Sequence, residues 1–537
     1  MKLIINILFL FIAISCHAQA SDKLNEDELY SLKNWEFESS TYSASIDKNE
    51  IFIHCNKTLT SQKWSFFKLN LNPRNQYLNH PVISLKVKTD ETFLLQIKPV
   101  GSNHLNDWYE MDVHPYQEGQ LILIQLDQLK NSPIKEIYFY VNGEDCRPYK
   151  FNFSIQELAI GQDPDYSNDI ELSNATDPDL VYKGHELFNK LKENRYRGIL
   201  YGMHDAVGYG VGWKGDPQKS DVKEVCGSYP ALFSWEVNHI FDPLKADLLA
   251  QKIKWVHEKG GINTFVWHTF DPSAKSFYTS QLHEPKKVLP SLLQGGKDHE
   301  YYKESLTQLA HFLKGLRDKN GHTIPILFRP FHEHNGDWFW WGKTHVSESA
   351  YIQLWQFTVD YLKDSLEVHN LLYVFSPDGQ KINASNPYLY GYPGDDYVDI
   401  LALDYYFDNS RNKEKRHFIQ QVEYIVQLAE QKGKVAAISE IGDRKGWKNI
   451  NNLQTKNWHT KVVLASIKNS PIAQKIAYMC TWRNANKNHH FAPYPGHPSE
   501  NDFKQFFDDP LTQFLVDIQV QAQAIRPSQA ATKPWLN

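Results

Sequence analysis

The chain has 537 residues, a formal net charge of -6 and 14% aromatic residues. This length is sufficient for more than one domain with a sizeable core. The weak negative charge gives no reason to expect nucleic acid or an anionic membrane surface as a partner. The 15 Trp and 29 Tyr fit large cores or clefts that bind sugars, because these side chains combine an apolar ring with a polar group.

Residues 1–20 begin with a short basic start and continue with an apolar run over residues 3–14. The run is too short to span a membrane, so it predicts a secretory signal and a periplasmic or extracellular protein. The sequence allows two alternative ways of processing this signal. Ala18-Gln19-Ala20 fits signal cleavage, whereas Cys16 would allow lipoprotein processing and membrane attachment by a lipid on this residue.

Four further cysteines follow, none of which has the spacing of metal ligands; they are Cys55, Cys146, Cys226 and Cys480. In an exported protein these residues are compatible with disulfides, and they are equally compatible with free buried thiols.

Residues 21–162 are rich in β-branched and aromatic runs, such as 82–87 and 137–141, with Asn, Gly and Pro between them. No helical period competes over any length, so this region is predicted to be an antiparallel β-sandwich. Residues 163–179 are polar and contain Pro164 and Pro178, which is the composition of a linker.

Residues 180–537 alternate between apolar strands and helical windows, one of which is 503–518. Eight strands are predicted, at 198–202, 232–235, 264–267, 326–328, 371–375, 400–403, 435–439 and 476–480. Eight such units are typical of a (β/α)8 barrel, and a doubly wound open sheet is the alternative. The barrel explains better why polar or aromatic residues follow all eight strands, because the carboxyl ends of barrel strands meet on one face.

Two of these strands, the fourth and the seventh, are followed by glutamates, Glu333 and Glu440. In a barrel the two carboxylates would face each other across the mouth, as glycosidic cleavage requires. One carboxyl group would remain protonated and the other ionised. A separation of about 5–5.5 Å would predict retention of configuration, and a wider one inversion.

The segment 329–341, which contains Arg329, His332, Glu333 and Trp338, resembles the acid/base segment of the β-mannanases of glycoside hydrolase family 26. Ser439-Glu440-Ile441-Gly442 is similar to the nucleophile strand of that family. Further similar motifs are Tyr209-Gly210-Val211-Gly212-Trp213, Ser220-Asp221-Val222, Tyr229-Pro230-Ala231, Trp235-Glu236, Asp404-Tyr405-Tyr406 and Thr481-Trp482-Arg483-Asn484. The resemblance covers about 180–520.

The resemblance implies that Glu333 is the acid/base and Glu440 the nucleophile, with no metal or other cofactor. It implies sugar-binding or nearby polar roles for His204, His268, His332, Trp338, Asp404, Tyr406, Trp482 and Arg483. Tyr405 and Tyr406 cannot both point into the barrel, because neighbours on a strand alternate, and the family favours Tyr406. Trp340 and Trp341 remain open between loop packing and sugar platforms.

The resemblance therefore predicts a retaining β-1,4-mannanase that acts on mannan, glucomannan or galactomannan, with endo and exo action both open. The alternatives are the same barrel acting on mixed-linkage β-glucan or β-1,3-xylan, or a non-catalytic glycan-binding protein. A monomer is expected, with β-mannan or manno-oligosaccharides as its partner. The N-terminal domain resembles modules of polysaccharide-degrading enzymes, and either binds glycan through Trp64, Trp108 or Tyr109 or acts as a spacer.

Overall fold

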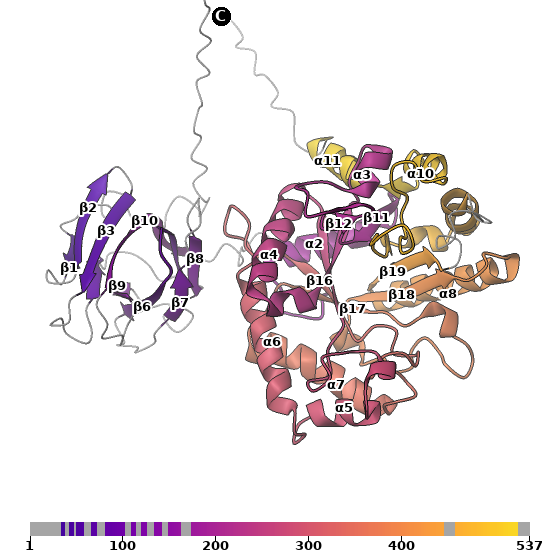
Figure 1. The fold of residues 1–537 in the computed structure, drawn as a ribbon, viewed down its shortest axis with the longest axis horizontal. Helices are drawn as coiled ribbons and strands as arrows, with labels where there is room; N and C mark the ends of the chain where they lie inside the picture. Colours follow the sequence, from indigo (N-terminus) through magenta and orange to yellow (C-terminus); the bar gives the residue numbers. More distant parts are fainter. Residues whose placement is uncertain are drawn as a thin grey trace, which may run out of the picture. The chain divides into compact units, whose positions relative to one another are not determined.

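The computed structural model describes residues 34–37, 42–47, 50–57, 66–71, 81–101, 109–113, 120–125, 134–141, 149–162, 173–444 and 457–524. The chain divides into two compact units, residues 1–169 and 170–537, and the division falls inside the predicted linker. Figure 1 shows both units and labels many of their helices and strands.

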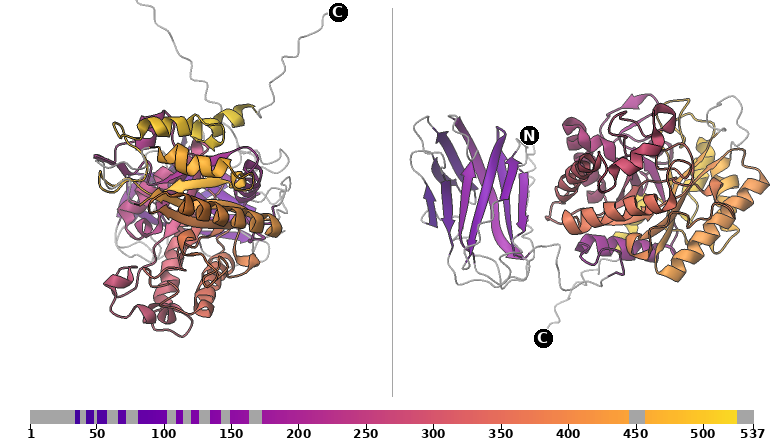
Figure 2. Two further views of the ribbon diagram at one scale, coloured as in Figure 1. Left: turned by 90° about the vertical axis from the view of Figure 1, so that its right-hand side faces the viewer. Right: turned by 90° about the horizontal axis from the view of Figure 1, so that it is seen from below.

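The N-terminal unit contains two antiparallel sheets of five strands each, and their strands run side by side in Figure 2. One sheet has the order β1 (Trp35–Phe37), β4 (Phe66–Asn70), β9 (Ile134–Val141), β6 (Phe93–Gly101) and β7 (Tyr109–Val113). The other has the order β2 (Tyr42–Asp47), β3 (Glu50–Lys57), β10 (Tyr149–Gln162), β5 (Pro81–Thr89) and β8 (Gln120–Gln125).

Both sheets contribute alternate residues to one hydrophobic core. On β9, for example, Ile137, Phe139 and Val141 are buried, whereas Tyr138 and Tyr140 remain partly exposed on the other face. This period of two is what two packed sheets require, and the predicted sandwich is confirmed. Tyr109 packs against this core, and Trp64, Trp108 and Cys146 lie outside the described residues.

The C-terminal unit is a closed barrel of eight parallel strands. In barrel order they are β11 (Ile199–His204), β14 (Leu232–Glu236), β15 (Ile262–Trp267), β16 (Ile326–Pro330), β17 (Leu371–Phe375), β18 (Ile400–Phe407), β19 (Val435–Asp443) and β20 (Tyr478–Thr481). The pairing of β14 with β11 closes the ring. The predicted barrel is therefore confirmed, and the open sheet is excluded.

Helices surround the strands of this unit (Figures 1 and 2). They are α2 (Tyr182–Asn194), α3 (Asp221–Cys226), α4 (Pro243–Glu258), α5 (Pro285–Leu292), α6 (His299–Lys314), α7 (Glu348–Asp360), α8 (Asn412–Lys432), α9 (Ala465–Lys468), α10 (Glu500–Phe507) and α11 (Leu515–Ala524). Asp242 caps α4 by accepting a hydrogen bond from the backbone of Lys245, and Pro243 occupies the first turn. Among the described residues, no helix has the length and apolar character needed to cross a bilayer.

The expected helix over 503–518 is interrupted. It ends at Phe507, and strand β21 (Thr512–Gln513) then pairs with β11 before α11 begins. Pro510 explains the interruption, because proline has no N–H to donate and restricts the residue before it.

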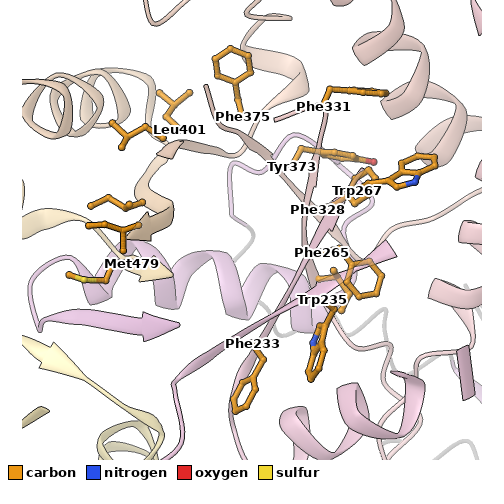
Figure 3. Packing of buried hydrophobic residues seen from close by; sticks show 14 of the residues in the cluster. Phe233, Trp235, Phe265, Trp267, Phe328, Phe331, Tyr373, Phe375, Leu401 and Met479 are labelled. Carbon is orange, nitrogen blue, oxygen red and sulfur yellow. The ribbon is translucent and has the colours of Figure 1, made fainter. Parts of the chain in front are cut away.

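Two hydrophobic layers result from the alternation along the barrel strands. The outer layer packs against the helices and is rich in aromatic residues, several of which appear in Figure 3. The inner layer consists mostly of aliphatic residues, including Leu200, Leu232, Leu327, Leu372, Ile400, Ala402 and Ala437. Polar side chains at the carboxyl ends of the strands continue the inner layer, and this position builds the site.

Candidate active site

Glu333 lies just beyond the end of β16, in a tight turn of the backbone. Phe331 and Glu333 both have positive φ angles, 47° and 52°, which is unusual for residues other than glycine. The backbone N–H of Glu333 donates to the carbonyl of Ser376, 2.8 Å away. Phe331 packs with the aromatic outer layer (Figure 3), so the turn is held at both ends. Strain of this kind is typical of functional sites.

Glu440 lies on β19, where the pairing with β18 shifts register. Leu403 pairs with Ile438 but Asp404 pairs with Glu440, so β19 has one extra residue at this point. Such a shift changes the direction in which a side chain points. The Glu440 carboxylate accepts a hydrogen bond from the Tyr406 hydroxyl at 2.5 Å and another from the guanidinium of Arg329.

Arg329, the fourth residue of β16, connects Glu440 to Asp404 beneath the mouth of the barrel. Its Nη1 donates to Asp404 Oδ2 at 2.8 Å, and Asp404 Oδ1 accepts from Ser376 Oγ at 2.7 Å. Burial alone would lower the pKa of Arg329, but the charges of Asp404 and Glu440 raise it above its usual value. The guanidinium therefore remains charged, and a charged partner on Glu440 favours an ionised carboxylate.

Glu333 has a different environment from Glu440. Its Oε2 accepts a hydrogen bond from Trp338 Nε1 at 2.7 Å. Burial raises the pKa of Glu333 well above its usual value, and the carboxylates of Asp404 and Asp378 add to this effect. Glu333 is therefore suited to carry a proton at neutral pH, as a general acid must.

Tyr406 points into the barrel, as predicted, because it alternates with Tyr405 on β18. Tyr405 belongs to the outer hydrophobic layer, whereas Tyr406 reaches Glu440. Burial and the Glu440 charge raise the pKa of Tyr406 well above its usual value, so the phenol stays protonated as a donor.

His268 follows the end of β15 and His332 follows the end of the neighbouring strand β16, so the two histidines lie together at the mouth of the barrel. Their rings meet edge to face, with centroids 4.7 Å apart. Burial and the charge of Arg329 lower the pKa of His332 well below its usual value, so this ring is neutral. His268 Nδ1 lies 2.5 Å from Glu236 Oε2 at the end of β14. Sequence reasoning assigned no role to Glu236, although its position after a barrel strand was a usable signal.

Trp482 stacks on the ring of His204, with centroids 4.1 Å apart and an angle of 28°. His204, which was expected to contact sugar, lies behind Trp482 and is only 2% exposed. Its Nδ1 contacts Ser234 Oγ at 2.9 Å, and its Nε2 lies 3.3 Å from Asp205 Oδ2. Both ring nitrogens thus have partners within the protein, and the ring face of His204 packs against Trp482.

Arg483 belongs to a second polar chain. Its Nη1 donates to the Tyr209 hydroxyl at 3.1 Å, and that hydroxyl donates to Asp205 Oδ2 at 2.7 Å. Burial alone would raise the pKa of Asp205, but His204 and Tyr209 lower it to about 2. Asp205 and Tyr209 had no assigned role before the structure, because only the fold brings them to Arg483.

The tryptophans of the segment 329–341 differ in exposure. Trp340 and Trp341 are fully buried, and their Nε1 atoms donate to the carbonyls of Thr269 and His332 at 2.8 and 2.7 Å. These two therefore pack the loop. Trp338 remains partly exposed beside Glu333, where a sugar can reach it.

The ligand atoms of His332, Asp404 and Glu440 lie within 4.8 Å of one another, as the ligands of a metal would. Arg329 already contributes a positive charge to both carboxylates, so this group does not need a cation. Cys55, Cys226 and Cys480 are free thiols; Cys55 and Cys480 are buried, as one of the two readings expected, and Cys226 is partly buried.

Asp221 joins two loops of the mouth. It accepts hydrogen bonds from the Val211 backbone at 3.0 Å and from Trp213 Nε1 at 2.6 Å, both in the loop that carries Tyr209. It also accepts from Asn484 Nδ2 at 2.8 Å, beside Arg483. Because Asp221 is 2% exposed, its carboxylate has little access to water as a substitute for these three donors.

We expect Asp221→Asn to lower the free energy of unfolding of the barrel by about 2 kcal/mol, because the new amide N–H would face a buried donor. Urea unfolding followed by tryptophan fluorescence measures this change. Asp216→Asn is the matched control, because Asp216 is exposed in the same loop and its 3.7 Å contact with Lys219 is a surface pair. Equal effects of the two substitutions on the free energy of unfolding would contradict the conclusion that Asp221 joins the two loops.

Comparison with known proteins gives consistent results. The model of glycosyl hydrolase family 26 matches residues 176–473, more than half of the chain. A mannan endo-1,4-beta-mannosidase of Bifidobacterium adolescentis is 32% identical over 358 residues, which are 62% of this chain and 35% of that protein. A mannan endo-1,4-beta-mannosidase of Bacillus subtilis is 33% identical over 205 residues, 35% of this chain and 54% of that protein. The chain thus spans about a third to a half of the length of these curated relatives.

Solved structures match the barrel more fully. GH26C from a Muricauda species has 33% identity and a TM-score of 0.60, covering 64% of this chain and 94% of that one. The GH26 beta-mannanase BoMan26A from Bacteroides ovatus has 33% identity and a TM-score of 0.55, covering 61% of this chain and 94% of that one. The fold, the paired carboxylates and the matched family model agree with the resemblance seen in the sequence: the chain belongs to glycosyl hydrolase family 26.

Proposed function

We propose that the barrel is a retaining glycoside hydrolase that cleaves β-1,4-mannosidic bonds in mannan, glucomannan or galactomannan. The observation that carries this proposal is the contrast between the two glutamates at one barrel mouth. Glu440 receives donors from Arg329 and Tyr406, whereas burial favours the protonated form of Glu333. The printed names of the relatives, which are mannan endo-1,4-beta-mannosidases, support mannan as the substrate.

In this mechanism Glu440 attacks the anomeric carbon and forms a covalent glycosyl-enzyme. The bond from that carbon to the glycosidic oxygen breaks, and Glu333 gives its proton to the leaving oxygen. Glu333 then removes a proton from water, which attacks the same carbon and releases Glu440. Two inversions at one carbon restore the original configuration, which is the meaning of retention.

The remaining site residues have distinct tasks in this proposal. Trp482 supports the sugar at the cleavage point, and Trp338 contacts the sugar on the leaving side. His268 and His332 contact sugar hydroxyls, and Arg483 is a nearby polar contact. Arg329, Asp404 and Tyr406 hold Glu440 in position, which agrees with their direct bonds to each other or to Glu440.

The direct test is incubation of the full chain with galactomannan, lichenan and β-1,3-xylan, followed by measurement of reducing sugar. We expect release from galactomannan and little from the other two. Proton NMR of mannohexaose during the first turnovers should show the β-anomer as the first product. Release from lichenan or β-1,3-xylan alone would reject mannan as the substrate, and an α-anomer as first product would reject retention.

A further inference from the structure

One outer face of the N-terminal sandwich carries a group of three aromatic side chains. Phe66 lies on β4, and Tyr138 and Tyr140 lie on β9, the central strand of its sheet. The ring centroid of Phe66 is 5.3 Å from that of Tyr138 and 5.9 Å from that of Tyr140. The two tyrosine rings are nearly parallel, with 17° between their planes and 6.4 Å between their centroids. We call these three residues the aromatic face.

Polar side chains of both charges adjoin the aromatic face. Lys68 Nζ lies 3.0 Å from Glu136 and 3.3 Å from Glu36, and it sits 5.5 Å from the centre of the Tyr138 ring. The Tyr138 hydroxyl donates to Glu136 Oε2 at 3.1 Å. Lys98 on β6 pairs with Tyr138 across the strands and so adds a second positive charge to this face. Because Lys68 and Lys98 balance Glu36 and Glu136, the surroundings of the rings favour an uncharged ligand over an ion.

The other sheet has an outer face of a different kind. Phe52 on β3 is 43% exposed, and its cross-strand neighbours are Ser45 and Ser154. Nearby, Glu50 accepts hydrogen bonds from Ser154 and Gln156. Within the part of this sheet that the structure describes, the Phe52 ring contacts no other aromatic ring. The aromatic face is therefore a local property of one sheet, and Phe52 offers a matched control.

We propose that the aromatic face binds an uncharged β-glycan chain, with the sugar rings stacked on Tyr138, Tyr140 and Phe66. A pyranose ring has an apolar C–H face that packs on an aromatic ring, and its hydroxyls can bond to the polar groups around it. The choice of β-mannan as this glycan rests on the proposed function of the barrel. The face would then hold the enzyme on insoluble polysaccharide, and no covalent step takes place there.

The test measures binding of the full chain to insoluble β-mannan in a Glu440→Ala background, with mannobiose added to occupy the barrel mouth. We expect the double substitution Tyr138→Ala and Tyr140→Ala to weaken the association by about tenfold or more, as loss of aromatic binding residues commonly does. Phe52→Ala alters the opposite face of the sandwich, so this variant should bind like the parent. Undiminished binding by the double variant, or an equal loss with Phe52→Ala, would overturn the proposal.

A second measurement avoids any effect of the substitutions on folding. The full chain with Glu440→Ala is nitrated with tetranitromethane, with and without mannan, and the modified tyrosines are identified by mass spectrometry. We expect mannan to protect Tyr138 and Tyr140 but not Tyr424, which is 43% exposed on the barrel. Equal nitration with and without mannan would reject the site. Failure of the proposed function would appear differently, as absence of mannohexaose hydrolysis by the parent while mannan still protects both tyrosines.

Discussion

Glu440→Ala is expected to lower kcat for mannan hydrolysis by roughly 10⁴-fold or more, because removal of the nucleophile removes the covalent route. Release of reducing sugar from mannohexaose measures the loss. Glu430→Gln is the control, because this carboxylate is exposed near the end of α8, on the outside of the barrel, where it pairs with Lys475 at 2.8 Å. The control should retain the activity of the parent.

Azide separates loss of the nucleophile from a general loss of structure. In Glu440→Ala, azide can enter the space left by the carboxylate and attack the anomeric carbon while Glu333 protonates the leaving oxygen. A single displacement inverts the configuration, so the product should be the α-mannosyl azide. A β-mannosyl azide from this variant would assign Glu440 to the acid/base role instead.

Glu333→Gln is expected to lower kcat/KM for mannan by roughly 10³-fold, within the range for loss of a general acid. A dinitrophenyl mannobioside needs no protonation of its leaving group, so the first step should survive with this substrate. The second step also needs Glu333 as a base, so the glycosyl-enzyme should accumulate. Stopped-flow measurements should therefore show a burst of dinitrophenolate followed by slow turnover.

The pH dependence follows from the raised pKa of Glu333. A raised pKa keeps the acid protonated to higher pH, and activity on mannan falls as pH rises through that pKa because the proton is lost. In Glu333→Gln this alkaline decline should disappear from the burst rate. A decline that persists in the variant, or a burst lost as fully as mannan hydrolysis, would show that Glu333 is not the proton donor.

Local patterns in the sequence were sufficient to predict the barrel and to place its two glutamates at the ends of strands. Each strand is a short apolar run with polar residues after it, and hydrophobic burial selects such runs wherever they occur along the chain. Once eight runs are counted, closure of the ring places the ends of the fourth and seventh together. Glu333 and Glu440 could therefore be placed at one mouth before any contact was known.

The sequence also showed that neighbouring residues on a strand point to opposite sides. Spacing alone did not show which of the two points into the barrel. Spacing showed only that Tyr405 and Tyr406 point to opposite sides. The family resemblance favoured Tyr406 as the inward residue, and packing of Tyr405 in the outer layer agrees with this choice. In the same way, full burial assigned Trp340 and Trp341 to loop packing and left Trp338 beside Glu333.

What the sequence determined by itself is the order of the elements, the barrel and the identity of its carboxylate pair, because these depend on short-range periodicity. The tertiary structure decided which groups hold that pair. Arg329 bonds to Asp404, which is 75 residues away in the sequence, and to Glu440, which is 111 residues away. Asp221 bonds to Asn484 across 263 residues. Contacts between such distant residues depend on how strands align and loops close, and no local pattern encodes that alignment.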